Sequence, residues 1–417
     1  MKSKFRSTYA ACFIGYIVQG IAVNLAPIFF IIFQTDYKIS YASLANLILI
    51  TFATQLFIDA ISVKLVDVLG LRRMALIAHI SATLGLVGLG ILPFIMAPFA
   101  GIAISLFFAA IGSGFIEVII SPIIDAIPKN TSKSVMSFLH SFYCWGQMST
   151  ILISTLLLLL FGRENWRFIP FIWAAIPFIN IFIFIKAPMP EIVSKEERTP
   201  LKKLFKSRNF IILLIIMICS GAAEISISQW ASIFAEKGLG VTKAVGDLLG
   251  PCLFAFFMGT GRVIFGLLGT KVNNKKALGL CGFFTVVCYL ITVFVPIPVI
   301  GLLGVALTGL GVSFMWPGTL SLGSELFPMG GMSVFSFAAL CGDIGCTLGP
   351  WIAGQISDAF GSTDAALNIA EKVGSSTEQI GLRAGLLVCA IFPMIMAIAV
   401  HLIRSKKENN EVKNENN

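Results

Sequence analysis

The stretch GSGFIEVIISPIIDAIPKNTSKSVMSFLHSFYCWGQ, residues 112–147, is apolar over most of its length. It nevertheless contains Glu117, Asp125 and His140 inside or at the edges of its hydrophobic runs, and it has one short polar break at residues 129–134. Ionisable side chains are costly inside a hydrophobic span, so such a group marks a functional site by default. The stretch therefore predicts a pair of apolar helices that carry chemically active groups.

The composition of the whole chain indicates a membrane protein. Of its 417 residues, 57% are hydrophobic and 12% are charged, whereas a soluble domain is about 25% charged. The mean hydropathy of +0.91 fits many runs that are long enough to cross a bilayer. Such spans must be helical, because lipid offers no partner for backbone N–H and C=O groups. The expected class is an all-α membrane protein.

Twelve transmembrane helices are predicted, in two pseudo-symmetric six-helix bundles. The N-terminal bundle is expected at residues 1–187, a cytoplasmic linker at 188–208, the C-terminal bundle at 209–405 and a disordered cytoplasmic tail at 406–417. The individual spans are expected at residues 9–33, 41–66, 74–97, 99–127, 134–161, 168–186, 209–235, 243–269, 276–295, 298–323, 332–360 and 381–404.

The distribution of Lys and Arg indicates how the chain is oriented. With the N-terminus inside, 22 of the 30 Lys and Arg residues fall in inside segments and 7 in outside segments, while Arg262 lies within a span. Cytoplasmic loops of membrane proteins carry such an excess. We therefore expect a multi-pass protein of the plasma (inner) membrane with both termini in the cytoplasm. The same distribution accounts for the net charge of +9 without nucleic acid as a partner.

The two halves of the chain carry similar features in the same order, as expected of a duplicated transporter. The loops at residues 67–73 and 266–276 each end in a basic pair. Further correspondences join Gly112 and Gly114 to Gly309 and Gly311, Pro122 to Pro317, Pro128 to Pro328, and Ser137, Phe138 and Gly146 to Ser336, Phe337 and Gly345.

The loop at residues 67–73 carries a family resemblance. It contains Asp67, Gly70, Arg72 and Arg73, and it resembles the G-x-x-x-D-R-x-G-R-R signature of the major facilitator superfamily. The resemblance implies that two bundles rock about a central solute site, and it extends over all twelve spans.

Within that superfamily, Glu117 on a Gly-rich span followed by Pro122 and Pro128 resembles the fucose/glucose permease branch of sugar:proton symporters. The MWP of residues 315–317 is similar to the same branch. The resemblance implies a secondary active transporter that moves a small polar solute, a sugar or polyol, with protons. Glu117 is the first candidate for proton coupling and Glu224 the second. Na⁺ is the alternative coupling ion, through Asp59 and Glu117.

Candidate solute-binding residues combine aromatic rings, which stack on sugar rings, with amides and carboxylates, which bond hydroxyl groups. Glu117 and His140 are expected at a similar depth, where they either form a functional pair or only lock two helices together. The expected solute-binding residues are Gln19, Asn24, His140, Tyr143, Gln147, Glu224, Gln229, Trp230 and Trp316.

The remaining buried charges are expected to form structural ion pairs or a gate. Asp343 lies among Gly342, Gly345 and Gly349, and Arg262 is the one deep cation in that half of the sequence, so an Asp343–Arg262 pair is predicted. Asp59, Asp67 and Arg72 are assigned to the same class.

Several functions are excluded or kept as alternatives. The chain has no GxxxxGK[ST], HExxH or GxSxG motif in a polar context, so we expect no enzyme activity, cofactor or catalytic metal. The nine cysteines lie in apolar segments without a CxxC pair, which predicts neither disulfides nor a structural metal. A monomer embedded in the lipid bilayer is expected. Two alternatives stay open, drug or metabolite efflux and a non-transporting membrane sensor or scaffold.

Overall fold

The computed structural model describes residues 5–127, 133–190, 204–268, 272–327 and 331–403, and every regular element within those ranges is a helix. The first half of the chain forms α1 (Arg6–Ile28), α2 (Phe30–Tyr37), α3 (Tyr41–Ile95), α4 (Pro98–Ala126), α5 (Lys133–Phe161) and α6 (Ile169–Lys186). The second half forms α8 (Arg208–Ile233), α9 (Lys243–Asp247), α10 (Leu253–Leu268), α11 (Asn274–Phe294), α12 (Pro298–Val312), α13 (Met315–Leu326), α14 (Gly331–Gly361), α15 (Asp364–Val373), α16 (Thr377–Cys389) and α17 (Ile391–His401). The expected all-α class is confirmed.

The number of long apolar helices agrees with the predicted twelve-helix fold. Eleven helical segments of the described chain are long and apolar enough to cross a membrane. α14 is a further helix of 31 residues, more than the ~20 that a bilayer requires. α3 contains two of the eleven segments, Tyr41–Ser62 and Val68–Ile95, and its backbone breaks at Gly70, near the start of the second, with φ 72° and ψ 158°. That backbone conformation suits glycine. The loop at residues 67–73, which resembles the superfamily signature, is therefore a sharp break within one helical element.

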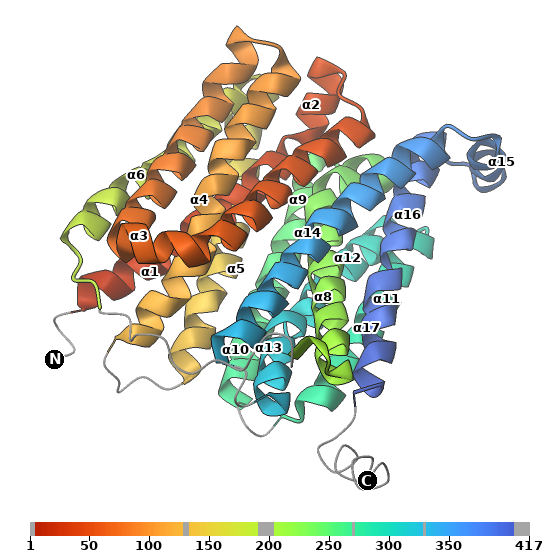
Figure 1. Ribbon diagram of the computed structural model, residues 1–417. Coiled ribbons are helices and arrows are strands. Elements are labelled where there is room, and N and C mark those ends of the chain that lie inside the picture. The colour runs from red at the N-terminus through yellow and green to blue at the C-terminus, as the bar shows by residue number, and fades with distance from the viewer. Residues whose placement is uncertain (1–4, 128–132, 191–203, 269–271, 328–330, 404–417) are drawn as a thin grey trace, which may run out of the picture.

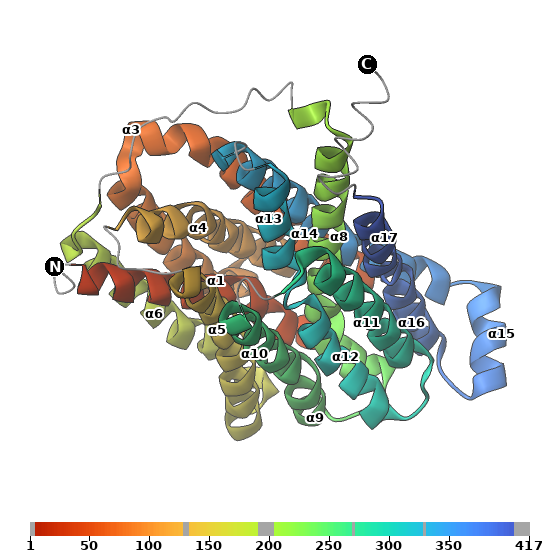
Figure 2. The same ribbon diagram turned by 90° about the horizontal axis from the view of Figure 1, so that it is seen from below.

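The helices form two bundles that lie side by side (Figure 1). One bundle contains α1 to α6 and the other contains α8 to α17, and Figure 2 shows α5 of the first bundle beside α10 of the second. We call the side where α1 begins and α17 ends the terminal face, and the side with the α3–α4 turn and α15 the distal face. The helices of both bundles run between these two faces.

The predicted repeat is visible in how the helices of each bundle approach one another. A Cβ atom on Gly146 of α5 would collide with the backbone of α1 at Ile17. A Cβ atom on Gly345 of α14 would collide with the backbone of α8 at Ile218. Small residues permit such close contact between membrane helices. The matching glycines therefore perform the same packing task in the two halves.

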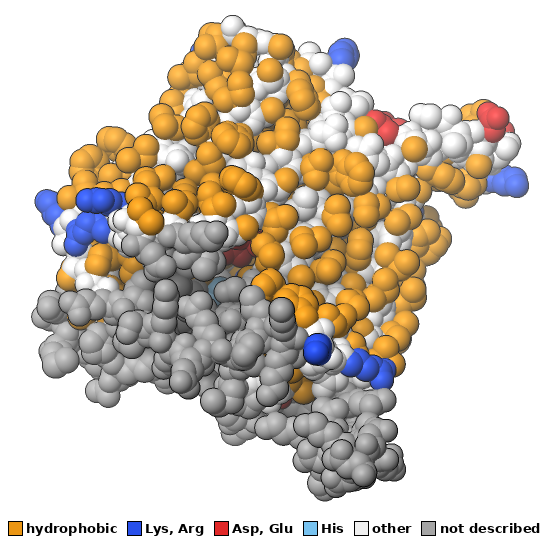
Figure 3. Space-filling model, in the orientation of Figure 1, with side chains coloured by type: hydrophobic (Ala, Val, Ile, Leu, Met, Phe, Trp, Pro, Cys, Tyr) orange, Lys and Arg blue, Asp and Glu red, His pale blue; other side chains and the backbone are white. Residues whose placement is uncertain are grey.

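The outer surface suits contact with lipid. Figure 3 shows apolar side chains over the lateral face of both bundles and blue Lys and Arg side chains near its margins. Large apolar residues are strongly exposed in both bundles, among them Phe57 (62%), Leu160 (75%) and Leu280 (69%). A soluble protein rarely exposes so continuous an apolar surface. The exposed side chains therefore fit a protein surrounded by hydrocarbon.

The two bundles are joined by polar contacts at their distal ends. The Tyr41 hydroxyl donates to Glu378 (2.6 Å), and the backbone N–H of Ala42 donates to Asp358 (2.9 Å). On the other flank, the Thr155 hydroxyl donates to Asp247 (2.9 Å). In each contact the donor lies in one bundle and the acceptor in the other. The structure is therefore closed at its distal face.

Some predicted features cannot be compared with the structure. The tail at residues 406–417 and most of the linker at 188–208 lie outside the described residues. The side chains of Asp67 and Asp125 also lie outside the described part.

Candidate functional site

Glu117 of α4 lies at the centre of a polar cluster between the bundles. Its Oε2 atom accepts a hydrogen bond from the Gln19 amide of α1 (2.8 Å) and another from the Gln55 amide of α3. The carbonyl oxygen of Gln55 in turn accepts from the Ser113 hydroxyl (2.9 Å). Gln55 was absent from the predicted site, although its position one helical turn before Asp59 in TFATQLFIDA was a usable signal. Glu117 is thus held in a defined orientation by two amides.

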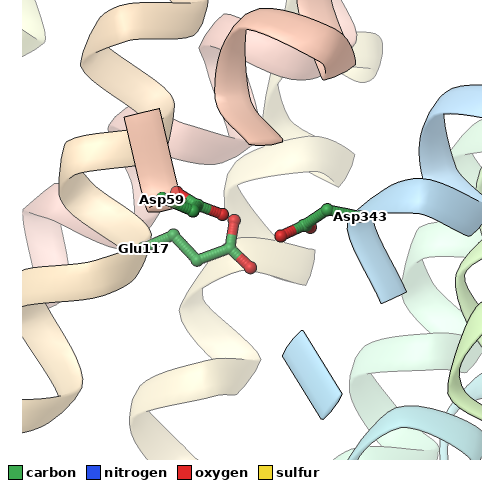
Figure 4. A group of neighbouring side chains, drawn as sticks. All are labelled: Asp59, Glu117 and Asp343. Carbon is green, nitrogen blue, oxygen red and sulfur yellow. The ribbon is translucent and has the colours of Figure 1, made fainter. Parts of the chain in front are cut away.

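Three carboxyl groups meet at this point. One oxygen each from Asp59 of α3, Glu117 of α4 and Asp343 of α14 lies within 4.8 Å of the other two. Figure 4 shows the Asp343 side chain extending from the second bundle toward Glu117 and Asp59 of the first. Asp343 is 1% exposed. We call these three residues the carboxylate cluster.

The predicted Asp343–Arg262 pair is wrong. Arg262 of α10 instead binds Glu224 of α8, with its Nη2 atom 3.1 Å from both carboxylate oxygens. The position of a residue within an apolar run indicates its depth in the membrane, but it does not indicate which neighbouring helix the side chain faces. Asp343 is turned toward the first bundle, whereas Glu224 is turned toward Arg262 within the second.

Several predicted solute-binding residues come together beside this ion pair. The Asn24 amide of α1 donates to the Tyr143 hydroxyl of α5 (3.3 Å). The Gln147 amide of α5 donates to the Ser228 hydroxyl of α8 (2.8 Å), which links the two bundles. The Gln229 amide of α8 donates to the carbonyl of Val23 on α1 (3.3 Å). Amides from both bundles thus lie at the same interface.

His140 lies one helical turn nearer the terminal face than Cys144, on the same helix. Its ring centroid is 5.0 Å from that of Tyr16 on α1. Glu117 accepts hydrogen bonds from the amides of Gln19 and Gln55, and its proposed pairing with His140 stays a prediction.

The two predicted tryptophans are packed against protein. Trp230 is 1% exposed, and its indole N–H donates to the carbonyl of Pro350 (2.9 Å). Its ring lies beside Phe30 and Tyr41, with centroids 6.2 and 6.1 Å away. Trp316 is partly buried, and its ring presses on the Gly342 backbone of α14. In this conformation Trp230 belongs to the closed distal layer.

Arg72 supports the end of a helix. Its guanidinium donates to the backbone carbonyls of Phe184, Ile185 and Ala187, where α6 ends. The last carbonyls of a helix have no partner within the helix, and a cation near them is stabilising. The described contacts of Arg72 therefore assign it to helix capping in place of the predicted ion pair or gate.

A second polar cluster near the distal face was not predicted. Asp247 is fully buried and accepts hydrogen bonds from Thr155 and Ser232, while Lys243 lies 2.9 Å from it. The i,i+4 spacing in KAVGD was the available signal. On the same face, Arg163 lies 3.6 Å from Glu236.

Comparison with known proteins places the chain in a family. The model of the Major Facilitator Superfamily matches residues 12–350 and, in a second overlapping match, residues 239–417. The chain therefore belongs to the Major Facilitator Superfamily and is a multi-pass integral membrane transporter. Members of this superfamily are in general not enzymes.

The relatives and solved structures that the chain resembles are named for different solutes. The chain is 26% identical over 361 residues to the "Multi-drug resistance efflux pump PmrA" of Streptococcus pneumoniae, covering 83% of this chain and 88% of that protein. In fold it is similar to the E.coli fucose:proton symporter FucP, with a TM-score of 0.64, 15% identity and coverage of 97% and 100%. It is also similar to a D-xylose-proton symporter, with a TM-score of 0.74, 12% identity and coverage of 94% and 97%.

Proposed function

We propose that this transporter moves a small polar solute, a sugar or polyol, together with protons by alternating access. The observation that carries the proposal is Glu117, a carboxylate held by Gln19 and Gln55 inside the interface between the bundles. An ionisable group at that position can bind a proton from one side and release it to the other as the bundles rock. The fold similarity to two sugar:proton symporters supports the same class of function.

The solute is expected between the bundles, next to the ion pair of Glu224 and Arg262. The amides of Asn24, Gln147 and Gln229 lie at that interface and suit hydroxyl groups. Trp230 and Trp316 would become ring-stacking partners when the bundles rearrange. The whole expected set is Gln19, Asn24, His140, Tyr143, Gln147, Glu224, Gln229, Trp230 and Trp316, with Glu224 as the second candidate for proton coupling.

The placement in the cell follows from the charge distribution. The terminal face is assigned to the cytoplasm, because inside segments carry most Lys and Arg residues. A monomer in the plasma membrane is part of the same proposal. The bundles are assigned to residues 1–187 and 209–405, with 188–208 as the linker and 406–417 as the tail.

Reconstitution in liposomes tests the transport proposal. With an inward proton gradient, we expect accumulation of one sugar or polyol and solute-driven proton entry, both stronger at lower external pH. Glu117→Gln keeps the amide contacts but cannot release a proton, so we expect accumulation to fall to the level of empty liposomes. Glu371→Gln on the exposed helix α15 removes one carboxylate elsewhere and should transport normally.

Two results would contradict this proposal. Solute flux without proton movement at any pH would remove the symport mechanism. Full solute accumulation by the Glu117→Gln variant would show that Glu117 has no part in the symport mechanism.

Efflux of a drug or amphipathic metabolite is the second candidate. It is favoured by the 26% identity to PmrA over 83% of the chain. Cells that produce the protein would then extrude fluorescent amphipathic dyes, and Glu117→Gln cells would retain them. A sugar symporter leaves dye retention unchanged, so this assay separates the two candidates.

A further inference from the structure

The carboxylate cluster contains buried oxygen atoms without a donor. Among the described residues, Asp59 Oδ1 and Asp343 Oδ2 have no hydrogen-bond partner. Gln19 is 5% exposed and its amide N–H is bound to Glu117, yet its carbonyl oxygen also has no partner. A buried acceptor without a donor destabilises the folded protein, and more so when the acceptor is charged. Two of these oxygens belong to the carboxylate cluster and the third belongs to a residue bonded to Glu117, which indicates that the cluster binds something positive.

Arg262, the nearby cation, is not the positive partner of the carboxylate cluster. Arg262 lies within electrostatic reach of Glu117, but its guanidinium is bound to Glu224. The other titratable neighbours are Glu224, within electrostatic reach of Glu117, and the thiols of Cys341 and Cys346, on the same helix as Asp343. Asp59 and Asp343 therefore face each other and Glu117, and none of the three has a cationic side chain bound to it in the described chain.

The three acids do not have equal surroundings. Glu117 receives two amide N–H groups on one oxygen, and these donors favour its negative charge. Asp59 and Asp343 have no such donors on their unpartnered oxygens. Two carboxyl groups in contact can form a hydrogen bond only when one proton lies between them, as in a carboxylate dyad. The arrangement therefore favours Asp59 and Asp343 as the pair that holds a proton.

The position of this pair relates it to the motion of the bundles. Asp59 belongs to the first bundle and Asp343 to the second. The helices that carry them, α3 and α14, are already in contact at the distal face through Ala42 and Asp358, and through Asn46 and Trp351 (3.2 Å). The acid pair lies further along the same two helices, toward the terminal face. A proton there extends the contact, and its loss leaves two negative charges that repel across the interface.

We propose that Asp59 and Asp343 share one proton across the bundle interface, and that this proton holds α3 against α14 in the conformation described. This inference rests on the proposed function, because Glu117, the group proposed to couple protons to transport, belongs to the same cluster built by both bundles. The titration belongs to the cluster as a unit, since three interacting acids do not release protons independently. Proton release to the terminal side then separates the bundles there.

The test measures thermal unfolding of the purified full-length protein without any solute, from about pH 5 to about pH 9. A proton held in the folded state contributes stability at low pH that is lost as the pH rises. The melting temperature of the wild-type protein should therefore fall toward high pH. In Asp343→Asn, the amide donates to Asp59 at every pH, so the fall should be smaller by about 3 °C or more.

Asp358→Asn is the matched control. It removes a carboxylate from the same helix and the same interface, at the distal contact with Ala42. Its pH profile should keep the wild-type slope, whatever its starting melting temperature. Asp59→Asn should reproduce the flattened profile of Asp343→Asn, and it replaces that variant if Asp343→Asn does not fold.

The result that overturns the inference is an equal pH slope in wild type, Asp343→Asn and Asp59→Asn. A second arm replaces choline chloride by NaCl at constant ionic strength. If Na⁺ restores the melting temperature at high pH in the wild type alone, the cluster binds sodium and the shared proton is wrong. If transport is proton-coupled but the slope of melting temperature against pH is the same in all variants, only this inference is contradicted. If the slopes differ as expected but no solute is transported, only the proposed function is contradicted.

Discussion

The buried ion pair of Arg262 and Glu224 shows how strongly single residues constrain this interface. The Arg262 side chain is 11% exposed and that of Glu224 is 8% exposed, so neither charge is well hydrated. Removing one member of such a pair leaves the other buried and uncompensated, at a cost of about 3–5 kcal/mol. Replacing both members is often far less costly. The pair is therefore a unit, and single substitutions alone do not measure the contribution of either residue to stability.

A double-substitution cycle checks this unit. We expect Glu224→Gln and Arg262→Gln each to lower the melting temperature more than the double variant does, because each single change leaves one buried charge without a partner. The measurement is thermal unfolding in detergent at fixed pH. Additive effects of the two changes would contradict a direct pair, and the same cycle on Asp343 and Arg262 should be additive.

The limits of prediction are clearest for these residues. Glu117, Glu224, Arg262 and Asp343 could be recognised as important from their position in apolar runs, because burial of a charge is costly. Their partners could not be predicted, since a rotation of α14 by part of a turn decides whether Asp343 faces Arg262 or Asp59. Gln55 was overlooked because a single amide in a span is also common in ordinary helix packing.

Within each bundle, the elements are organised by glycine contacts. Gly146 and Gly345 occupy equivalent places in α5 and α14, against α1 and α8. Their spacing to a Ser-Phe pair was readable in the sequence, and so were the helices, the break near Gly70 and the Pro-bounded turn between α3 and α4. Each of these patterns lies within a short segment of the sequence. The contact between α3 and α14 joins segments about 300 residues apart, and no local pattern indicates it.

The glycine contacts predict a specific loss of stability. Gly146→Ala places a methyl group against the backbone of α1, which cannot move aside as a flexible side chain could. We expect destabilisation at or above the upper end of the usual ~1–3 kcal/mol for overpacking. The measurement is the melting temperature and the yield of monodisperse protein. Gly250→Ala, where the nearest side-chain atoms are 3.4 and 3.8 Å away, is the control and should be tolerated.

Over the whole molecule, the two faces are held differently. The distal face is closed by hydrogen bonds from hydroxyl and backbone donors to Glu378, Asp358 and Asp247. Further toward the terminal face, α3 and α14 carry Asp59 and Asp343 of the carboxylate cluster. Hydrogen bonds to carboxylates therefore contribute to closure of the distal face.

The distal contacts predict how the molecule opens. The double substitution Tyr41→Phe and Thr155→Val removes two donors to carboxylates of the other bundle with little change of shape. Hydrogen bonds to charged groups contribute about 1.5–3 kcal/mol each. We expect amide exchange in the first turns of α3 and in residues 350–360 to quicken at least about tenfold. Hydrogen–deuterium exchange with mass spectrometry measures this.

Thr83→Val is the control for that experiment, because its hydroxyl donates to the carbonyl of His79 within its own helix (2.7 Å). Its distal exchange should match the wild type. Unchanged exchange in the double variant would mean that apolar packing, including Trp230, closes the distal face without these bonds.

The depth of the carboxylate cluster has an electrical consequence. Asp59 and Glu117 lie within segments that span the membrane, and Asp343 lies in α14 beside them. A positive charge that travels from one aqueous side to these acids crosses part of the voltage drop across the bilayer, which amounts to about 2.3 kcal/mol per charge for each 100 mV. Occupancy of the cluster would thus respond to membrane potential as well as to concentration. A resting cell could drive such a carrier with its voltage even when the pH on its two sides is equal.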